Sequence, residues 1–240
     1  MLKVELHTHT GDDPVDTIPY STGDLIDRAA ALEFDGLAIT LHEHQLDLCR
    51  WQAYAAERGV VLIPGVERTI EGHHVLLLNF ERGTEHVRTF DDLAALKRSG
   101  SGLVVAPHPF FPSTSCLWGD LDRHADLFDA VERNAMFTSA IDFNRRAERW
   151  ARHHGKPVVG NGDVHRLEQL GTTYSLVDAE RDPAAICTAV AAGHVEVVSR
   201  PLPWSTCIPL LASLFLSRQG RAPVAEPAFT SSQRSPADGR

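Results

Sequence analysis

Two histidines separated by a single residue, His7 and His9, give this chain its clearest chemical signal. The segment around them alternates apolar and polar side chains, which is the period of a β-strand, so both imidazoles would lie on one side of the chain. Divalent transition metals bind neutral imidazole nitrogens at about 2.0–2.1 Å, and two converging rings suit that geometry. A pair of this kind is weak evidence alone, because surface histidines on a strand share the same spacing.

Further metal-binding residue types follow nearly every apolar run that we predict to be a strand. The predicted strands are Val4–Thr8, Gly36–Thr40, Val60–Pro64, Val75–Phe80, Leu103–Ala106, Phe128–Glu132, Pro157–Gly160 and Val195–Ser199. In α/β folds, functional residues collect at the carboxyl ends of the strands, so these side chains are expected to meet. Imidazoles and carboxylates without thiolates suit two or three hard-to-borderline metal ions. Glu132 is either an acid of the interior or an ion-pair partner of Arg133.

Amphipathic segments lie between the predicted strands. Ser21 and Asp24 resemble a capping box at the start of one helix, and Pro183 suits the first turn of another. The predicted helical segments are Leu25–Ala30, Asp91–Arg98, Ile141–His154 and Ala184–Ala192. Repeated βα units predict an α/β protein with a largely parallel sheet, either open and doubly wound or closed as a barrel.

Composition narrows the classes of function. The 240 residues carry a formal net charge of −9, and 43% are hydrophobic, which is sufficient for a core. An acidic chain argues against broad nucleic-acid binding, whereas a small phosphorylated substrate is compatible with it because metal ions supply positive charge. The four cysteines are far apart and form no CxxC, so neither a zinc knuckle nor a disulfide framework is predicted.

Two further expectations concern location and the end of the chain. The amino-terminal strand leaves no room for a signal peptide, and the apolar stretch 204–216 is shorter than the roughly 20 residues of a membrane span, so we expect a cytoplasmic protein without membrane contact. We expect one domain over residues 1–200 and a largely disordered C-terminal segment over 201–240, which holds six of the 14 prolines. Residues 204–216 are either a final packed helix or a docking segment.

Six motifs in order resemble the PHP (polymerase and histidinol phosphatase) family, over about residues 1–200. They are His7–Thr10 (HTHT), Ile39–His42 (ITLH), Pro64–Glu67 (PGVE), Gly72–Val75 (GHHV), Ala106–Pro109 (APHP) and Gly160–His165 (GNGDVH). The resemblance implies a distorted (βα)7 barrel with a three-metal site at its mouth, and phosphoester hydrolysis as the usual chemistry.

The resemblance also assigns metal ligands. The first ion would be held by His7, His9, Glu67 and Asp163, the second by Glu67, His74 and His108, and the third by Asp13, His42 and His165. Asp12 is the alternative to Asp13, and His73 is the alternative to His74.

The expected function is metal-dependent hydrolysis of a phosphoester in a small phosphorylated metabolite or nucleotide, through a metal-activated water. Glu67 and Asp163 are the expected catalytic residues, Arg166 is expected to bind the substrate, and the cofactors are two or three ions of Mn, Zn or Fe. The alternatives are a metal-dependent hydrolase of C–N bonds and a non-catalytic metal-binding module. No stable nucleic-acid complex is expected, and the oligomeric state is not predicted.

Overall fold

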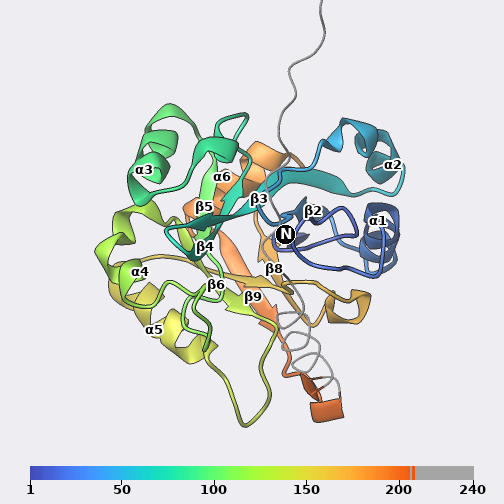
Figure 1. Ribbon diagram of the computed structural model, residues 1–240. Coiled ribbons are helices and arrows are strands. Elements are labelled where there is room, and N and C mark those ends of the chain that lie inside the picture. The colour runs from blue at the N-terminus through green and yellow to red at the C-terminus, as the bar shows by residue number, and fades with distance from the viewer. Residues whose placement is uncertain (206, 209–240) are drawn as a thin grey trace, which may run out of the picture.

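A single mixed sheet forms the centre of the computed structural model, which describes residues 1–205 and 207–208 (Figure 1). In this part of the chain the sheet has nine strands in the order β7-β6-β5-β4-β3-β2-β1-β8-β9. The strands are β1 Leu2–Glu5, β2 Gly36–Ile39, β3 Val61–Ile70, β4 His73–Leu78, β5 Leu103–Ala106, β6 Ala130–Asn134, β7 Val158–Asn161, β8 Thr173–Val177 and β9 Val195–Ser199.

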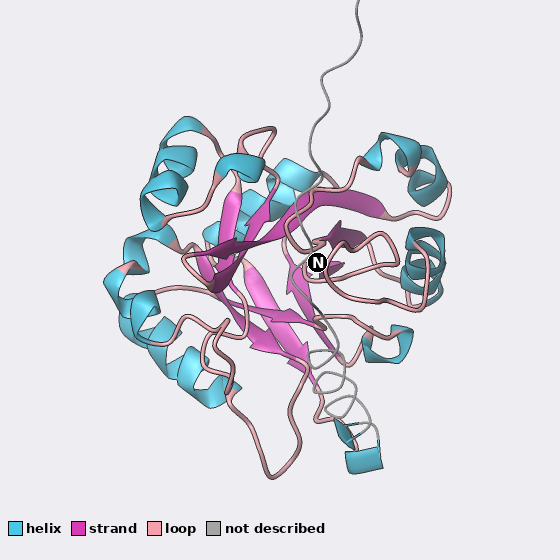
Figure 2. Cartoon of the chain, viewed as in Figure 1, coloured by secondary structure: helices cyan, strands magenta, loops and turns pink. Residues whose placement is uncertain are grey.

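The sheet curls until its two ends nearly meet. The Gly160 backbone N–H of β7 donates to the Ser175 hydroxyl of β8 at 2.9 Å. A Cβ atom at Gly160 would lie 2.7 Å from the Tyr174 carbonyl oxygen and 2.8 Å from Val197, so only glycine permits this approach. The result is a barrel-like α/β fold with helices outside the sheet, which confirms the predicted fold class (Figure 2).

The directions and number of the strands differ from the prediction. Four neighbouring pairs are parallel and four are antiparallel, so the expectation of a largely parallel sheet was wrong. One cause is the tight turn at Glu71 and Gly72, which both have positive φ (49° and 90°), the conformation that joins hairpin strands. The other is β8, which sequence analysis missed and which pairs antiparallel with both β1 and β9. Of the nine strands in the described residues, only β8 is absent from the list of predicted strands.

Three of the four longer helices of the described residues begin at a capping side chain, whereas the helix Asn144–His154 begins after Phe143 without one. Ser21 and Thr89 form complete capping boxes, and Asp182 caps a helix that starts with proline. The helices of the described residues are α1 Thr22–Ala31, α2 Gln52–Ala56, α3 Phe90–Ser99, α4 Gly119–Arg123, α5 Asn144–His154 and α6 Pro183–Ala191, with short 3-10 segments η1 Leu48–Arg50, η2 Thr84–His86, η3 Ala125–Leu127 and η4 Leu167–Gln169. Sequence analysis predicted the four longer α-helices and missed the five-residue α2 and α4.

The barrel interior has an apolar end, which α6 covers. Side chains from eight strands and α6 form one buried cluster there, including Leu76, Val105 and Ile186. Two other apolar clusters lie between the sheet and the outer helices. Every second residue of a strand faces the barrel interior. Interior residues further along the same strands therefore lie at the opposite end of the barrel.

After β9 the chain packs against the loop that follows β6. The Leu202 N–H donates to the Phe137 carbonyl at 2.8 Å, and Leu202 and Cys207 contact Met136. Of the stretch 204–216, the structure describes only residues 204, 205, 207 and 208. Of the segment 201–240, which we expected to be largely disordered, residues 206 and 209–240 lie outside the described residues. Within those residues, none of the helices has the length and apolar character to cross a membrane.

Candidate metal centre

Backbone pairing beyond the regular strands brings the motif residues together. The chain after β1 pairs with the loop after β7: the His9 N–H donates to the Val164 carbonyl at 3.1 Å, and the Val164 N–H donates to the His7 carbonyl at 3.2 Å. A second bridge joins His42 to Glu67 on β3. These two bridges place segments from four motifs side by side at the polar end of the barrel.

All nine predicted metal ligands lie in this cluster. Within the described residues, five groups of three side chains have possible ligand atoms within 4.8 Å of one another. Each predicted ligand belongs to at least one of these groups, which are drawn from His7, His9, Asp13, His42, Glu67, His74, His108, Asp163 and His165.

Glu67 lies at the centre of the cluster and is 1% exposed. Its two carboxylate oxygens face different sets of imidazoles. The distances are 3.3 Å from Oε2 to His7 Nε2, 3.4 Å to His9 Nε2 and 3.1 Å to His42 Nε2, and from Oε1 2.7 Å to His74 Nδ1 and 3.4 Å to His108 Nε2. A carboxylate with two such oxygens can serve two cations at once.

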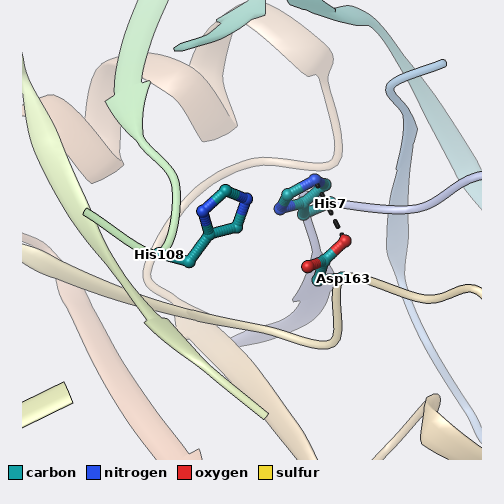
Figure 3. A group of neighbouring side chains, drawn as sticks. All are labelled: His7, His108 and Asp163. Atoms are coloured by element: carbon teal, nitrogen blue, oxygen red, sulfur yellow. Dashed lines mark ion pairs between the residues drawn. The ribbon is translucent and has the colours of Figure 1, made fainter. Parts of the chain in front are cut away.

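Asp163 lies at the open side of the cluster. Figure 3 shows His7 and Asp163 side by side, with His108 facing them across the centre. His7 Nε2 is 3.4 Å from Asp163 Oδ1, and the Asp163 side chain is 24% exposed. Asp163 and His108 both have positive φ (48° and 30°), which is uncommon and costly for residues with a side chain. Contacts nearby hold this strain, including a 2.8 Å hydrogen bond from the His108 N–H to Glu132.

The acidic loop after His9 contributes Asp13. Its Oδ2 lies 2.9 Å from His9 Nδ1 and 3.0 Å from His42 Nδ1. Asp12, the alternative, instead accepts a hydrogen bond from the Thr22 hydroxyl at 2.7 Å. The structure thus places Asp13 against the cluster and turns Asp12 away from it.

Asp16 is a further acid of this loop that sequence analysis did not select. Its Oδ2 lies 3.2 Å from His165 Nε2 and 3.9 Å from His42 Nδ1. Its position three residues after Asp13 in an acidic loop was the available signal. Because the Asp16 carboxylate faces both His42 and His165, it could bind the third ion that the family resemblance assigns to them.

The two histidines of the GHHV motif point in opposite directions, as strand alternation requires. His74 faces Glu67, whereas His73 Nε2 lies 3.1 Å from Asp120 of α4. The structure therefore brings His74, and not His73, into the cluster.

A buried polar layer supports the cluster from below. Glu132 is fully buried, accepts a hydrogen bond from His7 Nδ1 at 2.8 Å, and accepts another from the Asn161 amide at 3.0 Å. Arg133 points the other way and pairs with Glu148. Glu132 is therefore an acid of the interior, and its bond to Nδ1 leaves His7 Nε2 available to the centre.

The charges of the cluster are strongly interdependent. Burial alone would lower the pKa of His7, but the carboxylates of Asp163, Glu132 and Glu67 raise that pKa well above its usual value. Conversely, burial would raise the pKa of Glu67, but the imidazoles of His74, His7 and His42 hold that pKa well below its usual range. Such a set binds cations, protons or metal ions, in direct competition.

Three buried atoms support metal ions as the better occupants. His9 Nε2, Glu67 Oε1 and His74 Nδ1 are buried and have no hydrogen-bond partner with acceptable geometry, although charged neighbours lie close to each of them. Buried polar groups without partners are rare, because each costs free energy. Two imidazole nitrogens and one carboxylate oxygen are ligand atoms that divalent metal ions accept in proteins.

Arg166 lies at the edge of the cluster. It follows His165, its side chain is exposed, and its backbone N–H donates to Gln169 Oε1 at 2.9 Å. Its backbone therefore lies beside the candidate ligand His165, and its side chain is not packed in the core.

Comparisons with known proteins agree with the fold. The family model described as PHP-associated matches residues 142–195, which run from the start of α5 to the start of β9. No curated protein matches the sequence of the chain.

Several solved structures share the architecture. A two-domain protein from Bacteroides vulgatus, described as containing a predicted PHP-like metal-dependent phosphoesterase, has a TM-score of 0.61 and 18% identity over 88% of this chain and 69% of its own. PsfC from Pseudomonas syringae also has a TM-score of 0.61, with 17% identity over 91% of this chain and 98% of its own. Endonuclease Q, bound to a 27-mer duplex with an abasic lesion, has a TM-score of 0.58 and 14% identity over 88% of this chain and 67% of its own. The resemblance to the PHP family is thereby confirmed.

Proposed function

We propose that this protein is a metal-dependent phosphoesterase that hydrolyses a small phosphorylated metabolite or nucleotide. The observation that carries the proposal is Glu67, whose two oxygens face two sets of imidazoles in a buried centre. Phosphoester hydrolysis depends mainly on positioning and on neutralising charge, which adjacent divalent ions do well.

Two or three divalent ions, of Mn, Zn or Fe, would lower the pKa of a water molecule and neutralise the phosphate when bound. Following the family resemblance, the residues that would hold them are His7, His9, Glu67 and Asp163 for the first ion, Glu67, His74 and His108 for the second, and His42, His165 and Asp13 for the third. The structure supports the pooled set, because each of these residues lies in one of the five groups of neighbouring ligand atoms. Asp16 is the further acid for the third ion, because Asp13 Oδ2 already lies against His9 Nδ1 and His42 Nδ1.

The protein's own contacts fix the direction of three of these imidazoles. Glu132 accepts from Nδ1 of His7, and Asp13 accepts from Nδ1 of both His9 and His42, so in all three rings Nε2 is directed at Glu67. Carboxylates in this position make the ring a stronger donor to a cation.

Glu67 and Asp163 have different proposed catalytic roles because their exposure differs. Glu67 is 1% exposed and organises the centre from below, whereas Asp163 is 24% exposed and meets the incoming substrate. The exposed Arg166 next to His165 supplies a positive charge where the phosphate would enter.

The charge of the chain favours a small substrate over nucleic acid. Endonuclease Q shows that this fold can act on a DNA duplex. The present chain, however, has a formal net charge of −9, and duplex binding depends on neutralising many phosphates with Lys and Arg. A single phosphate group needs only the local charge of the centre.

The test measures metal content and hydrolysis together in two variants. We expect His9→Ala and Asp163→Asn to lose bound metal, measured by elemental analysis, and to lose at least about a hundredfold in hydrolysis of p-nitrophenyl phosphate with added Mn²⁺. His86→Ala is the matched control, because this imidazole is exposed and contacts only Glu85 among the described ion pairs. Wild-type turnover in both site variants would contradict the proposal.

The same assay includes other bond types. Cyclic amides test for C–N hydrolysis by the same centre, and a duplex with an abasic lesion tests for strand cleavage. Hydrolysis of either in preference to small phosphoesters would contradict the proposed substrate class.

A further inference from the structure

Two partly exposed aromatic rings adjoin the candidate metal centre. The rings of His108 and Phe111 are 6.3 Å apart between centroids and meet edge to face. The Phe143 ring lies 5.4 Å beyond Phe111, and Phe143 is 39% exposed. We call the rings of Phe111 and Phe143 the aromatic shelf. The shelf thus begins at a candidate ligand and extends from the centre toward solvent.

The shelf is built from two loops that lie side by side because the strands before them are neighbours. Phe111 belongs to the loop after β5, and Phe143 ends the loop after β6, directly before α5 (Figure 1). Neither ring belongs to the buried apolar cluster between the sheet and α5, although Phe110, Phe128 and Trp150 do. Packing of the core therefore does not account for the positions of the two rings.

Flat aromatic surfaces beside a reaction centre bind flat partners. An aromatic face stacks on a nucleobase without sequence or hydrogen-bond requirements, and such contacts contribute substantially to binding. A phosphate held at the centre would leave the next part of the same molecule over Phe111 and a ring further along over Phe143. A compound with one sugar between its phosphate and its ring matches this order.

We propose that the base of a nucleotide stacks on Phe143 of the aromatic shelf while its sugar lies over Phe111, whose ring is tilted by 54° from that of Phe143, so that the substrate of the centre is a nucleoside monophosphate and not a simple sugar phosphate. This inference rests on the proposed phosphoesterase function and names its substrate class. Phe111 and Phe143 are specificity-determining residues: they hold the leaving nucleoside and take no part in the chemistry at phosphorus.

The test compares two substrates that share the bond to be cleaved. Adenosine 5′-monophosphate and ribose 5-phosphate lose phosphate from the same ribose oxygen and differ in the base. With Mn²⁺ added, we expect the wild-type protein to prefer the nucleotide in kcat/KM by roughly tenfold or more, the effect of one stacked base. Phe143→Leu should remove most of this preference through KM, and should leave metal content and the hydrolysis of ribose 5-phosphate unchanged. Phe111→Leu should raise KM for both substrates, because both place the ribose over this ring, and should leave metal content unchanged.

Trp51→Leu is the matched control. Trp51 is a partly exposed aromatic residue that contacts Tyr54 of α2 and lies next to Gly23 of α1, away from the shelf. This variant should keep the full preference for the nucleotide.

The outcomes separate the two proposals. Equal hydrolysis of both substrates by the wild type, or a preference for the nucleotide that survives in Phe143→Leu, would overturn the inference and leave the phosphoesterase intact. Hydrolysis of p-nitrophenyl phosphate with neither ribose compound cleaved would also overturn it. Absence of hydrolysis of every phosphoester, by protein shown to contain metal, would overturn the proposed function and the inference with it.

Discussion

The two ends of the barrel interior are built from the same strands and have opposite character. On β4, His74 faces the cluster, and Leu76 two residues later is part of the apolar interior. On β6 the order is reversed: Ala130 belongs to the apolar end, and Glu132 two residues later supports His7. A step of two residues along one face of a strand therefore separates core from candidate site.

The two ends contribute oppositely to the free energy of folding. The apolar end, closed by α6, stabilises the fold because it removes apolar surface from water. The polar end buries Glu67, Glu132 and His7 where charges cost free energy unless they are paired. Bound cations would compensate that cost, so the polar end is expected to depend on metal and the apolar end is not.

Replacing Glu67 has the largest expected effect on the polar end. Glu67→Gln keeps the shape of the side chain and removes the negative charge that two sets of imidazoles share. We expect phosphoesterase activity to fall to background and the bound metal to fall with it, measured on protein whose circular dichroism spectrum is unchanged. A variant that keeps its metal would show that Glu67 does not bridge the ions.

Replacing Leu76 tests the apolar end. Leu76 is fully buried, so Leu76→Ala should lower the free energy of unfolding by about 2–5 kcal/mol, measured by denaturant titration. Metal bound per folded chain should not change. If Leu76→Ala lost metal and kept its stability, the assignment of fold stability to the apolar end and of metal binding to the polar end would be wrong.

Glu132→Gln is expected to have a smaller effect, confined to the metal. The amide can no longer accept from His7 Nδ1 as a carboxylate does, so metal affinity should fall by about 10–100-fold, measured by competition with a chelator. Glu148→Gln is the control on the outer side, where Glu148 pairs with Arg133. Equal affinities in the two variants would exclude a supporting role for Glu132.

The last prediction concerns the pH dependence of stability and a single carboxyl group. Burial raises the pKa of Glu5 to about 8, against the opposing hydrogen bond from the Gly162 N–H. The folded state thus retains a proton that the unfolded chain releases near pH 4.5, so this stabilising contribution is present below pH 4.5 and is lost as the pH rises through 8. Between pH 5 and 9, wild type should lose more thermal stability than Glu5→Gln. Parallel melting curves in the two proteins would contradict the assignment.

Much of the fold was predictable because the strands and longer helices carry local signals. The bounds of β5 and β9 match their apolar runs, and capping residues mark the starts of α1, α3 and α6. The prediction ended β3 at Pro64, because Pro64 and Gly65 are typical of a strand end. The chain instead continues as a strand to Ile70. The missed β8 (TYSLV) mixes polar and apolar residues, and its pairing with β1 depends on contacts remote in sequence.

The candidate metal ligands were predictable because they lie in sequence motifs. The side chains that support those ligands were less predictable. The positions of His7, Glu67 and Asp163 follow from the ends of strands and from the family resemblance. The supporting contacts of Glu132 and the approach of Asp16 to His165 depend on how separate loops fold. No local pattern encodes such distances.

The most direct test of the account is anomalous X-ray diffraction from crystals grown with Mn²⁺. The account predicts separate manganese peaks on the two sides of Glu67, one next to Oε2 with His7 and His9, and one next to Oε1 with His74 and His108. A single peak bound by both oxygens, or manganese only at sites remote from Glu67, would contradict it.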